Sequence, residues 1–235
     1  MRRHLYWNGC FNARDLGGLK LSNGQDTVWR SIVRADSLDR LTLDEWTAVA
    51  KYGVRTIVDM RSDFEREAIS ERGNSAIRTI HRPLEDIKGD ADFWAEWSRF
   101  NCTPIYYSAF LKHCPTKVAG VFREIAQAEA GGIIFHCGSG RDRTGLIAIL
   151  LLAPVGVTSS EIVDDYKLTT ERLRARPGQE MEDTKIDQLL TQEKTTFEDE
   201  IVSLLSSFNV ETYLLKAGLS PVDIESVRSR LAPGL

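Results

Sequence analysis

Apolar residues recur along the first two thirds of the chain in short continuous runs, and each run is followed by a stretch with helical spacing. The runs predict strands at residues 28–34, 54–60, 76–83 and 131–136. The stretches between them predict helices at residues 41–53, 90–113, 115–129 and 144–152. This alternation predicts an α/β fold, with helices flanking a central, mostly parallel sheet of about four to five strands.

Single residues support the ends of two of these elements. Thr42 and Glu45 have the spacing of a capping box at the start of the first helix, and Gly53 is a suitable stop for it. Ser62 and Glu65 repeat this spacing just after the second predicted strand. The sequence therefore predicts a helix start in both places.

The last third of the chain shows only helical patterns. These patterns cover residues 158–173, about 187–208, 211–218 and 220–231. Pro177 and Gly178 separate the first of them from the second. Because no low-complexity linker or repeat divides the sequence, we expect a single domain over residues 1–235, with a sheet core at about 12–157 and an all-helical C-terminal part at about 158–235.

The composition narrows the class of protein. The chain has 235 residues, 42% of them hydrophobic, which is enough for one sizeable core. A formal net charge of −4 argues against a general nucleic-acid binder, which would carry a basic face or tail. No apolar run approaches the ~20 residues that span a bilayer, so we expect a soluble, cytoplasmic protein without an integral membrane segment.

The cysteines are scattered along the chain, at Cys10, Cys102, Cys114 and Cys137. This distribution does not resemble the disulfide framework of a small secreted domain, so reduced thiols are expected. Two of them follow a histidine directly, as His113-Cys114 and His136-Cys137. Adjacent residues lack the two-to-four-residue ligand spacing that suits a tetrahedral zinc site, so no metal is expected.

The most informative segment is HCGSGRDRTG, from His136 to Gly145, which joins the fourth predicted strand to the helix behind it. A turn from a strand into the start of a helix gathers unpaired backbone N–H groups, and the helix dipole adds partial positive charge. Gly138 and Gly140 let the backbone fold tightly with these N–H groups pointing inward. The segment therefore predicts an anion-binding loop.

Two side chains give this loop a chemistry. Cys137 is expected to be held as a thiolate by the same field, because reactive thiols in such settings have pKa values of ~3.5 to 7.5 against ~8.5 when free. Arg143 lies six positions later, so its guanidinium can fold back and grip two oxygens of the anion. Together they predict a phosphoryl-transfer site in which sulfur attacks phosphorus in line.

These residues carry a resemblance to a known family. His-Cys, five residues and Arg-Thr resemble the signature of the cysteine-dependent protein tyrosine phosphatases, and the whole loop is similar to the HCxxGKDRTG of their atypical bacterial tyrosine and dual-specificity branch. NARDLGG at residues 12–18 resembles the branch's NFRDLGG, and VRTIVDMRSDFE resembles its strand-plus-turn segment. GVTSSEIVDDYKLT resembles the segment after the loop helix, so the resemblance spans about residues 12–169.

The resemblance implies roles for the loop residues. Cys137 is the nucleophile that forms a phosphocysteine, and Arg143 binds phosphate and stabilises the transition state. Thr144 offers its hydroxyl to the sulfur when the thiolate leaves, and His136 holds the loop through a backbone contact. The residues implied to bind phosphate are Gly138, Ser139, Gly140, Arg141, Asp142 and Arg143.

The resemblance also implies a substrate class. It points to hydrolysis of phosphomonoesters on a phosphorylated protein or a phosphoinositide, with no cofactor. Arg141 stands where the branch usually has lysine. Because a planar fork replaces a point charge there, a preference for phosphoinositides is in doubt.

Three aspartates compete for the role of general acid, which must protonate the leaving oxygen. Asp142 lies in the loop, matches the aspartate of the branch and is the first choice. Asp86 follows the third predicted strand, where larger relatives carry a mobile acid loop, and is the second. Asp59 ends the second predicted strand and is placed to orient Arg143 instead. A salt-bridged Asp142 would have a depressed pKa and serve poorly as an acid.

Other polar residues have simpler interpretations. Asp15 in NARDLGG either caps a turn or supports the site. Arg34, Arg55 and Arg61 are interpreted as solvated or paired surface charges rather than ligand contacts.

Two alternatives from other functional classes stay open. A rhodanese-type sulfurtransferase also surrounds an anion with a loop that carries a cysteine at a strand-to-helix turn. A non-catalytic phosphate-binding module, a pseudophosphatase, would keep the loop without turnover. Arg143 followed by Thr144 and the match outside the loop favour the phosphatase.

Overall fold

A mixed sheet of five strands forms the centre of the computed structural model, which describes residues 1–66 and 75–234. The strands are β1 (Arg14–Asp15), β2 (Ile32–Ala35), β3 (Val54–Asp59), β4 (Arg78–His81) and β5 (Gly132–His136). Their order is β1-β2-β5-β3-β4, and all neighbours are parallel except β1 with β2. The predicted α/β fold with a mostly parallel sheet is confirmed.

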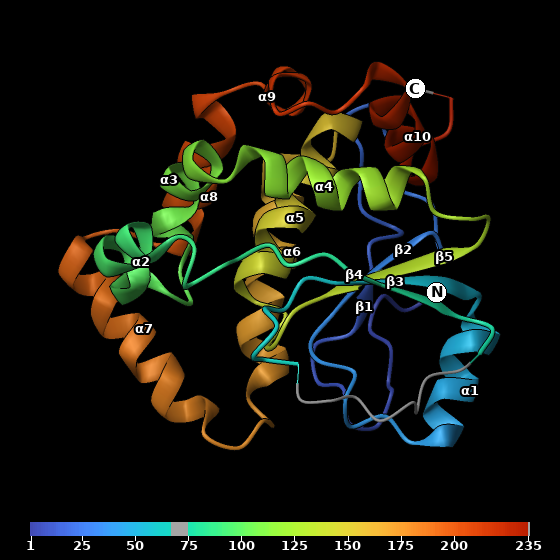
Figure 1. Ribbon diagram of the computed structural model, residues 1–235, viewed down its shortest axis with the longest axis horizontal. Helices are drawn as coiled ribbons and strands as arrows, with labels where there is room; N and C mark the ends of the chain where they lie inside the picture. Colours follow the sequence, from blue (N-terminus) through green and yellow to red (C-terminus); the bar gives the residue numbers. More distant parts are fainter. Residues whose placement is uncertain (67–74, 235) are drawn as a thin grey trace.

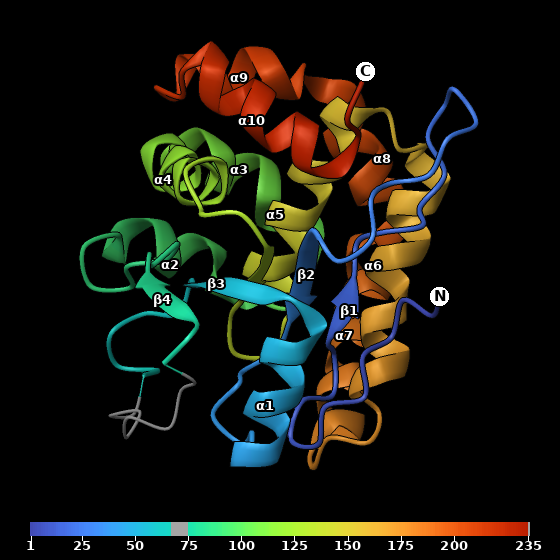
Figure 2. The same ribbon diagram turned by 90° about the vertical axis from the view of Figure 1, so that its right-hand side faces the viewer.

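Helices cover both faces of this sheet. In β5, Ile134 belongs to the core under α1 (Leu43–Tyr52), whereas Ile133 and Phe135 belong to the core under α4 (Pro115–Ala126) and α5 (Asp142–Leu152). Figures 1 and 2 show α1 on one side of the strands and α4 on the other. Because the central strands are buried on both faces, they appear in the sequence as continuous apolar runs.

The remaining helices lie mainly on the α4 and α5 side. They are α2 (Ala91–Trp97), α3 (Tyr107–His113), α6 (Ser159–Leu173), α7 (Gln179–Glu193), α8 (Phe197–Ser207), α9 (Val210–Lys216) and α10 (Pro221–Leu231), with short 3-10 turns at Ser98–Phe100, Pro104–Tyr106 and Ala153–Val155. The C-terminal helices share the large core, since α10 packs on α4 and α6 on α8.

The two capping-box predictions have different outcomes. The first is confirmed, because the Thr42 hydroxyl accepts the N–H of Glu45 at 3.3 Å at the start of α1. At the second, the N–H and hydroxyl of Ser62 both donate to the carboxylate of Glu65, at 2.9 and 2.7 Å. The helix start expected there is wrong within the described residues, because Asp63, Phe64 and Glu65 form a turn. Residues 67–74 lie outside the described residues.

The predicted strand at residues 28–34 is too long at its start. β2 begins only at Ile32, because Arg30 has a left-handed φ of 62° and forms a turn. The NARDLGG segment contributes an unpredicted edge strand, β1, which pairs antiparallel with β2. A two-residue strand is too short to leave a periodic signal in the sequence.

The single helix predicted at residues 90–113 is wrong. The chain forms α2 and α3 instead, joined by two short 3-10 turns. Cys102 has a φ of 71°, which a right-handed helix excludes, and Pro104 has no N–H to donate. The two residues interrupt the helical chain between the 3-10 turns at Ser98–Phe100 and Pro104–Tyr106.

The helix predicted at about residues 187–208 is also wrong. α7 starts at Gln179, directly after Gly178, and ends at Glu193, because the next residue, Lys194, has a left-handed φ of 55°. α8 then starts behind Thr196, whose hydroxyl accepts the N–H of Asp199 at 3.1 Å. By contrast, α1 ends at the predicted stop, Gly53, with a φ of 111°.

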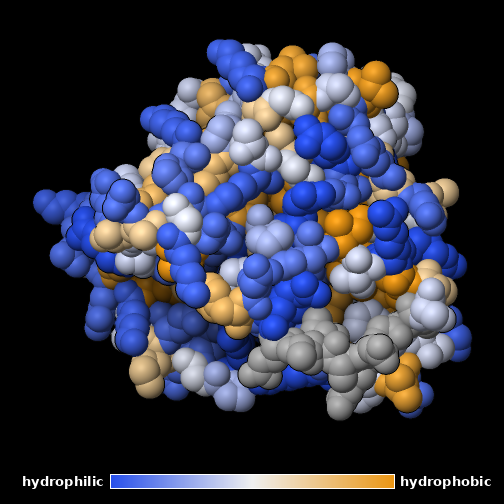
Figure 3. Space-filling view, viewed as in Figure 1, coloured by the Kyte–Doolittle hydropathy of each residue, from blue (hydrophilic) through white to orange (hydrophobic). Residues whose placement is uncertain are grey.

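The surface agrees with the charged composition of the chain. On the face shown in Figure 3, hydrophilic side chains predominate and apolar side chains form small separate groups. Among the described residues, no helix combines the length and the apolar character needed to cross a membrane.

Candidate active site

The segment HCGSGRDRTG forms a tight loop between β5, the central strand, and α5, whose first residue is Asp142. Gly140 has a φ of 71°, and a Cβ at this position would lie 2.7 Å from the carbonyl oxygen of Ala35. Only glycine fits this turn without strain. The loop therefore has the strand-to-helix geometry in which backbone N–H groups converge.

Donors from outside the loop hold its backbone carbonyls. The side-chain amide of Asn12 donates to the carbonyls of Ser139 and Gly140, at 3.1 and 3.2 Å. Arg34 donates to the same Gly140 carbonyl at 2.8 Å. Because the C=O and N–H of a trans peptide point in opposite directions, carbonyls held outward favour N–H groups that face inward.

The start of the loop is fixed in the same way. The N–H of Ser37 donates to the carbonyl of Gly138 at 2.9 Å, and Nδ1 of His136 lies 3.2 Å from the carbonyl of Cys137. On the other side of the ring, Nε2 of His136 lies 3.7 Å from the carboxylate of Asp59. His136 thus contacts the backbone of Cys137, the kind of contact that the family resemblance implies.

A buried group of charged residues supports this outer side of the loop, and we call Arg14, Arg34 and Asp165 the outer cluster. Asp165, from α6, accepts from Nε of Arg14 at 3.0 Å and from Nη1 of Arg34 at 2.7 Å. Burial raises the pKa of Asp165, but the charges of Arg14, Arg34 and Arg3 outweigh it and hold that pKa well below its usual range. The interpretation of Arg34 as a surface charge is wrong, because its side chain is 1% exposed.

Cys137 lies at the floor of the loop and is 1% exposed. The hydroxyl of Thr144, in the first turn of α5, donates to the Cys137 sulfur at 3.2 Å. The same hydroxyl lies 3.5 Å from the carbonyl of Ala35. The structure therefore brings the predicted nucleophile and the predicted hydroxyl donor into direct contact.

The guanidinium of Arg143 folds back over the loop, with Nη2 3.8 Å from the place that a Cβ on Gly138 would take. Glu65 accepts from Nη1 and Nη2 at 2.5 and 2.7 Å, and an oxygen of Glu85 lies 3.2 Å from Nε. Burial lowers the pKa of Arg143, but hydrogen bonds to Glu65 and the charges of Cys137 and Glu85 raise it above its usual value. Arg143 is therefore a permanent cation beside the sulfur.

Two carboxyl groups near Arg143 have raised pKa values. Burial raises the pKa of Asp142 to about 6, although Arg141 and Arg143 oppose this shift. Burial also raises the pKa of Glu85 to about 7, with Arg143 opposing it and Asp142 adding to it. Carboxyl groups of this kind can carry a proton near neutral pH. We call Glu65, Glu85, Asp142 and Arg143 the mouth group.

Asp142 is not the ion-pair partner of Arg143 among the described residues, whose carboxylate contacts to this arginine come from Glu65 and Glu85. Its Oδ1 atom is buried and has no hydrogen-bond partner within that part of the chain. Such an atom is costly to leave unpaired unless it is protonated or meets a ligand. The depressed pKa considered for a salt-bridged Asp142 is therefore not found.

Two other predicted site residues point elsewhere. The side chain of Arg141 is 1% exposed and pairs with Asp183 of α7 at 2.9 Å, so only its backbone faces the loop. Asp86 is exposed, and its carboxylate accepts the N–H of Gly89 at 2.9 Å within a surface turn. The acidic neighbour that contacts Arg143 is Glu85, one position earlier.

Asp59 was expected to orient Arg143, and the structure pairs it with other arginines. It accepts from Arg61 at 2.9 Å and lies 3.4 Å from Arg66. Arg61 is 2% exposed, so its interpretation as a surface charge is wrong. The three residues form a support below the loop, next to His136.

Asp15 is buried and holds a turn. One carboxylate oxygen accepts the N–H of Gly17 at 2.7 Å, and the other accepts the N–H of Arg30 at 2.8 Å and the hydroxyl of Tyr52. Of its two interpretations, the turn cap describes these contacts.

Sequence reasoning missed five residues that hold the loop or its arginine. These are Asn12, Glu65, Glu85, Arg34 and Asp165. Asn12 and Glu65 lie inside motifs that were noticed, and Glu85 is next to a considered aspartate, so a signal was present for these three. Asp165 lies in α6, and its pairing with Arg34 leaves no local pattern in the sequence.

Comparisons with known proteins agree with this geometry. A model of the tyrosine phosphatase family matches residues 5–233. A tyrosine-protein phosphatase of Nostoc commune is 28% identical in an alignment 164 residues long that covers 63% of this chain and 51% of that protein. A protein of Cupriavidus necator, named as a candidate tyrosine-protein phosphatase, is 27% identical over 177 residues, which are 73% of this chain and 64% of that protein. The chain thus spans less than two thirds of either relative.

Two solved structures of TpbA from P. aeruginosa also match. The one in complex with pTyr has a TM-score of 0.43 and 14% identity, and the match covers 81% of this chain and 88% of TpbA. The other has a TM-score of 0.41 and 15% identity, and the match covers 80% and 86%. The family model, in contrast, matches nearly the whole chain, including the loop. This chain therefore belongs to the tyrosine phosphatase family.

Proposed function

We propose that the chain hydrolyses phosphomonoesters, with Cys137 as the nucleophile and a phosphocysteine as the intermediate. The observation that carries the proposal is the loop itself, whose carbonyls are held from outside, with Cys137 at its floor and the Arg143 guanidinium close to Gly138. Inward N–H groups and a guanidinium can together neutralise the charge on phosphoryl oxygens. Membership in the tyrosine phosphatase family supports the same activity.

In the first step, the thiolate of Cys137 attacks phosphorus, a sulfur–phosphorus bond forms and the bond to the leaving oxygen breaks. The leaving oxygen takes a proton from a carboxylic acid. Asp142 is our first choice for this acid, because its pKa is raised to about 6 and its buried Oδ1 atom has no partner among the described residues. Glu85 is the second group with a suitable pKa, and Asp86 is the third candidate.

In the second step, a water molecule attacks the phosphocysteine and gives a proton to the carboxylate formed in the first step. The sulfur–phosphorus bond breaks, inorganic phosphate is released and Cys137 leaves as a thiolate. The hydroxyl of Thr144, 3.2 Å from the sulfur, donates a hydrogen bond to the departing thiolate. Arg143 stabilises the charge on the phosphoryl oxygens in both steps.

The substrate we favour is a phosphorylated protein, with phosphotyrosine first, because the family bears that name. Phosphoserine, phosphothreonine and phosphoinositides are the alternatives. The pairing of Arg141 with Asp183 disfavours phosphoinositides, since it keeps this guanidinium away from the loop mouth. We further propose that residues 1–235 act as one domain in the cytoplasm.

The test is turnover of para-nitrophenyl phosphate and of a phosphotyrosine peptide in the presence of EDTA. We expect phosphate release that vanadate blocks, and Cys137→Ser should reduce it to background. The matched control is Cys114→Ser, which removes a buried thiol outside the loop and should leave turnover in EDTA unchanged. Turnover that survives Cys137→Ser would rule out the proposed nucleophile.

Two further measurements separate the alternative functions. Rapid quenching of the wild-type protein with substrate should leave a phosphoryl group on the peptide that contains Cys137. A sulfurtransferase would instead form thiocyanate from thiosulfate and cyanide without releasing phosphate. A pseudophosphatase would bind vanadate without turnover of any phosphomonoester.

A further inference from the structure

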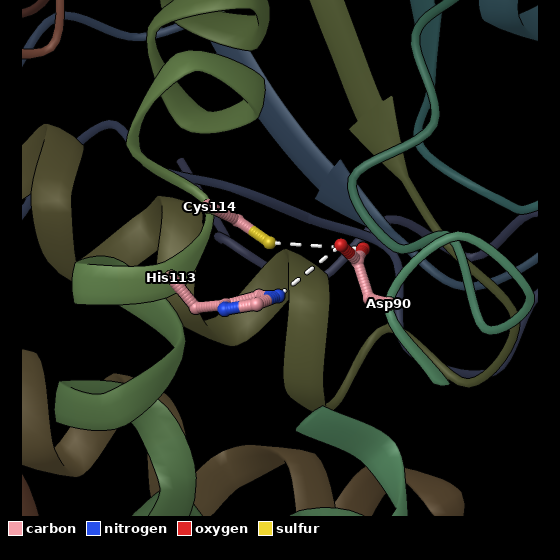
Figure 4. A group of neighbouring side chains, drawn as sticks. All are labelled: Asp90, His113 and Cys114. Atoms are coloured by element: carbon pink, nitrogen blue, oxygen red, sulfur yellow. Dashed lines mark hydrogen bonds and ion pairs between the residues drawn. The ribbon is translucent and has the colours of Figure 1, made fainter. Parts of the chain in front are cut away.

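Three side chains with metal-binding atoms meet outside the loop, at Asp90, His113 and Cys114. Their ligand atoms all lie within 4.8 Å of one another. The Asp90 carboxylate lies 3.2 Å from Nε2 of His113 and 3.9 Å from the Cys114 sulfur. Figure 4 shows the imidazole and the thiol side by side, both pointing at the carboxylate.

The fold explains how two adjacent residues can face one point. His113 ends α3 and Pro115 begins α4, so Cys114 lies at the junction, with a non-helical ψ of 43°. Neighbours within one helix point about 100° apart, and the break in the helix removes this divergence. The adjacency of His113 and Cys114, which argued against zinc in the sequence, is thereby compatible with both side chains binding one metal ion.

The third ligand comes from the other side of the site. Asp90 precedes α2, and its N–H donates to the carbonyl of Asp86 at 2.8 Å, which closes a turn. The ring of Phe93 stacks on the imidazole of His113, with centroids 4.7 Å apart and planes at 17°. The turn therefore positions the backbone of Asp90, and the stacking orients the imidazole of His113.

Burial gives the site a closed side and an open side. Cys114 is buried, with 3% exposure, whereas the side chain of His113 is 42% exposed. The ammonium of Lys117 pairs with the Asp90 carboxylate and shows that a positive charge is accepted there. The Lys117 side chain is 30% exposed, so it can move into solvent when another cation binds.

We propose that Asp90, His113 and Cys114 bind one zinc ion, with a water molecule as the fourth ligand on the open side. Zinc favours this mixture of thiolate, imidazole and carboxylate in a tetrahedral arrangement. Tetrahedral bonds of ~2.0 to 2.3 Å place ligand atoms ~3.5 Å apart, so modest side-chain shifts close the site. The Cys114 thiol loses its proton to solvent as the sulfur–zinc bond forms.

The site is separate from the proposed chemistry. It joins the start of α2 to the α3–α4 junction, and the hydrogen bonds and ion pairs that Asp90, His113 and Cys114 make within the described part of the chain involve none of the loop residues 136–145. A bound ion would thus fix the turn at residues 86–90, directly after Glu85 of the mouth group. We expect bound zinc to raise the free energy of unfolding. We also expect the metal-free protein, kept in EDTA, to retain its phosphatase turnover.

The test is titration of the full chain with Co²⁺ as a spectroscopic stand-in for zinc. The protein is first stripped with chelator, kept reduced, and carries Cys137→Ser so that the loop thiol cannot contribute. We expect one equivalent to bind, with a thiolate-to-cobalt charge-transfer band and the visible bands of a tetrahedral ion. Zinc should displace the cobalt. At a free zinc concentration a hundred times its Kd, the Tm should rise by about 5 to 10 °C.

Variants connect this signal to the three residues. Cys114→Ala should abolish the charge-transfer band, and His113→Asn, at an exposed ring, should weaken binding by more than about 10-fold. Lys117→Met should tighten binding several-fold, because the competing ammonium is gone. Cys102→Ala is the matched control and should keep the band.

Either of two results would overturn the proposal. One is the absence of a thiolate-to-cobalt band in a folded protein. The other is equal affinity in the parent and in His113→Asn, a variant whose exposed position keeps the test valid even where Cys114→Ala fails to fold.

Discussion

The outer cluster and the mouth group lie on two sides of one loop, and both combine guanidinium groups with carboxylates in opposite proportions. In the outer cluster, Asp165 is one carboxylate among several arginines, and its pKa is held well below the usual range. In the mouth group, Arg143 is one guanidinium among three carboxyl groups. Two of these, Asp142 and Glu85, have raised pKa values of about 6 and about 7.

The difference shows how one type of ion pair serves two purposes. An excess of arginine keeps a carboxylate ionised over the whole range of neutral pH, which suits a permanent support. In the mouth group Glu85 shares Arg143 with Glu65, and Asp142 has no ion pair with this arginine among the described residues. Burial therefore outweighs the attraction of Arg143 and raises the pKa of both groups. The same residue types thus form a permanent support on one side of the loop and, on the other side, carboxyl groups that can hold a proton near neutral pH.

The largest expected effect comes from removing the carboxylate of the outer cluster. Asp165→Asn leaves Arg14 and Arg34 buried without their carboxylate, so we expect the free energy of unfolding at pH 7 to fall by about 3 to 5 kcal/mol. Because the folded-state pKa of Asp165 is depressed, its stabilisation is present above the unfolded pKa of ~3.9 and is lost as pH falls further. Denaturant unfolding of wild type and variant at pH 7 and pH 3 measures both effects.

Thr169→Val is the matched control for this prediction. It removes a hydroxyl that accepts from Arg14 at 3.1 Å and leaves Asp165 in place. We expect a loss of about 1 kcal/mol that does not depend on pH. An equal loss of unfolding free energy in both variants would show that the Asp165 carboxylate stabilises the outer cluster no more than an ordinary hydrogen bond does.

The next effect concerns the proton source. An acid with a raised pKa is active while protonated, so kcat/KM should fall as pH rises past about 6 to 7, the values for Asp142 and Glu85. Asp142→Asn should remove this basic limb and lower kcat/KM by about 100-fold for aryl phosphates with poor leaving groups. Glu85→Gln should keep the limb, since the pKa of Asp142 is raised mainly by burial. The measurement is a pH–rate profile for each variant.

Asp86→Asn completes this set. Its carboxylate is exposed and accepts the N–H of Gly89, so we expect the limb to remain. If Glu85→Gln removed the basic limb of the pH–rate profile and Asp142→Asn kept it, Glu85 would be the general acid. A limb lost only in Asp86→Asn would give the acid role to a residue that must move to reach the loop.

The sequence was most informative where one short segment decides the structure. The structure confirms three local patterns: the loop between strand and helix, the capping of α1 by Thr42, and the alternation of strands with helices along the first two thirds of the chain. The helix breaks at Cys102 and Lys194 were missed, because each depends on a left-handed backbone at a residue other than glycine. Helical periodicity continues across such breaks and gives no warning of them.

The candidate residues at the centre of the site could be selected from the sequence, whereas most of those around it could not. Cys137, Arg143 and Thr144 follow from spacing within ten residues, whereas Asp165 reaches its arginine across 131 positions of the chain. Charged residues were assigned to the surface by their type alone, and burial of Arg34 reversed that assignment. Long-range pairing of opposite charges therefore requires the fold before it can be recognised.

The smallest expected effect concerns Glu65, whose carboxylate forms an ion pair with Arg143. Glu65 accepts from both terminal nitrogens of Arg143, the same donors that would grip phosphoryl oxygens. Burial raises the pKa of Glu65, but hydrogen bonds and charge from Arg143 lower it to about 2, so it competes as an anion at neutral pH. Glu65→Gln should lower KM by about 2- to 5-fold, which corresponds to the ~0.5 to 1 kcal/mol of a partly exposed ion pair.

Ser62→Ala is the control for this competition, because it removes one donor to Glu65 and leaves the negative charge in place. We expect its KM to stay near that of wild type. Steady-state kinetics with para-nitrophenyl phosphate at fixed ionic strength separates KM from kcat. A lower kcat with an unchanged KM in Glu65→Gln would mean that Glu65 orients Arg143 for the transition state, and the mouth group would then contain a support of the same kind as the outer cluster.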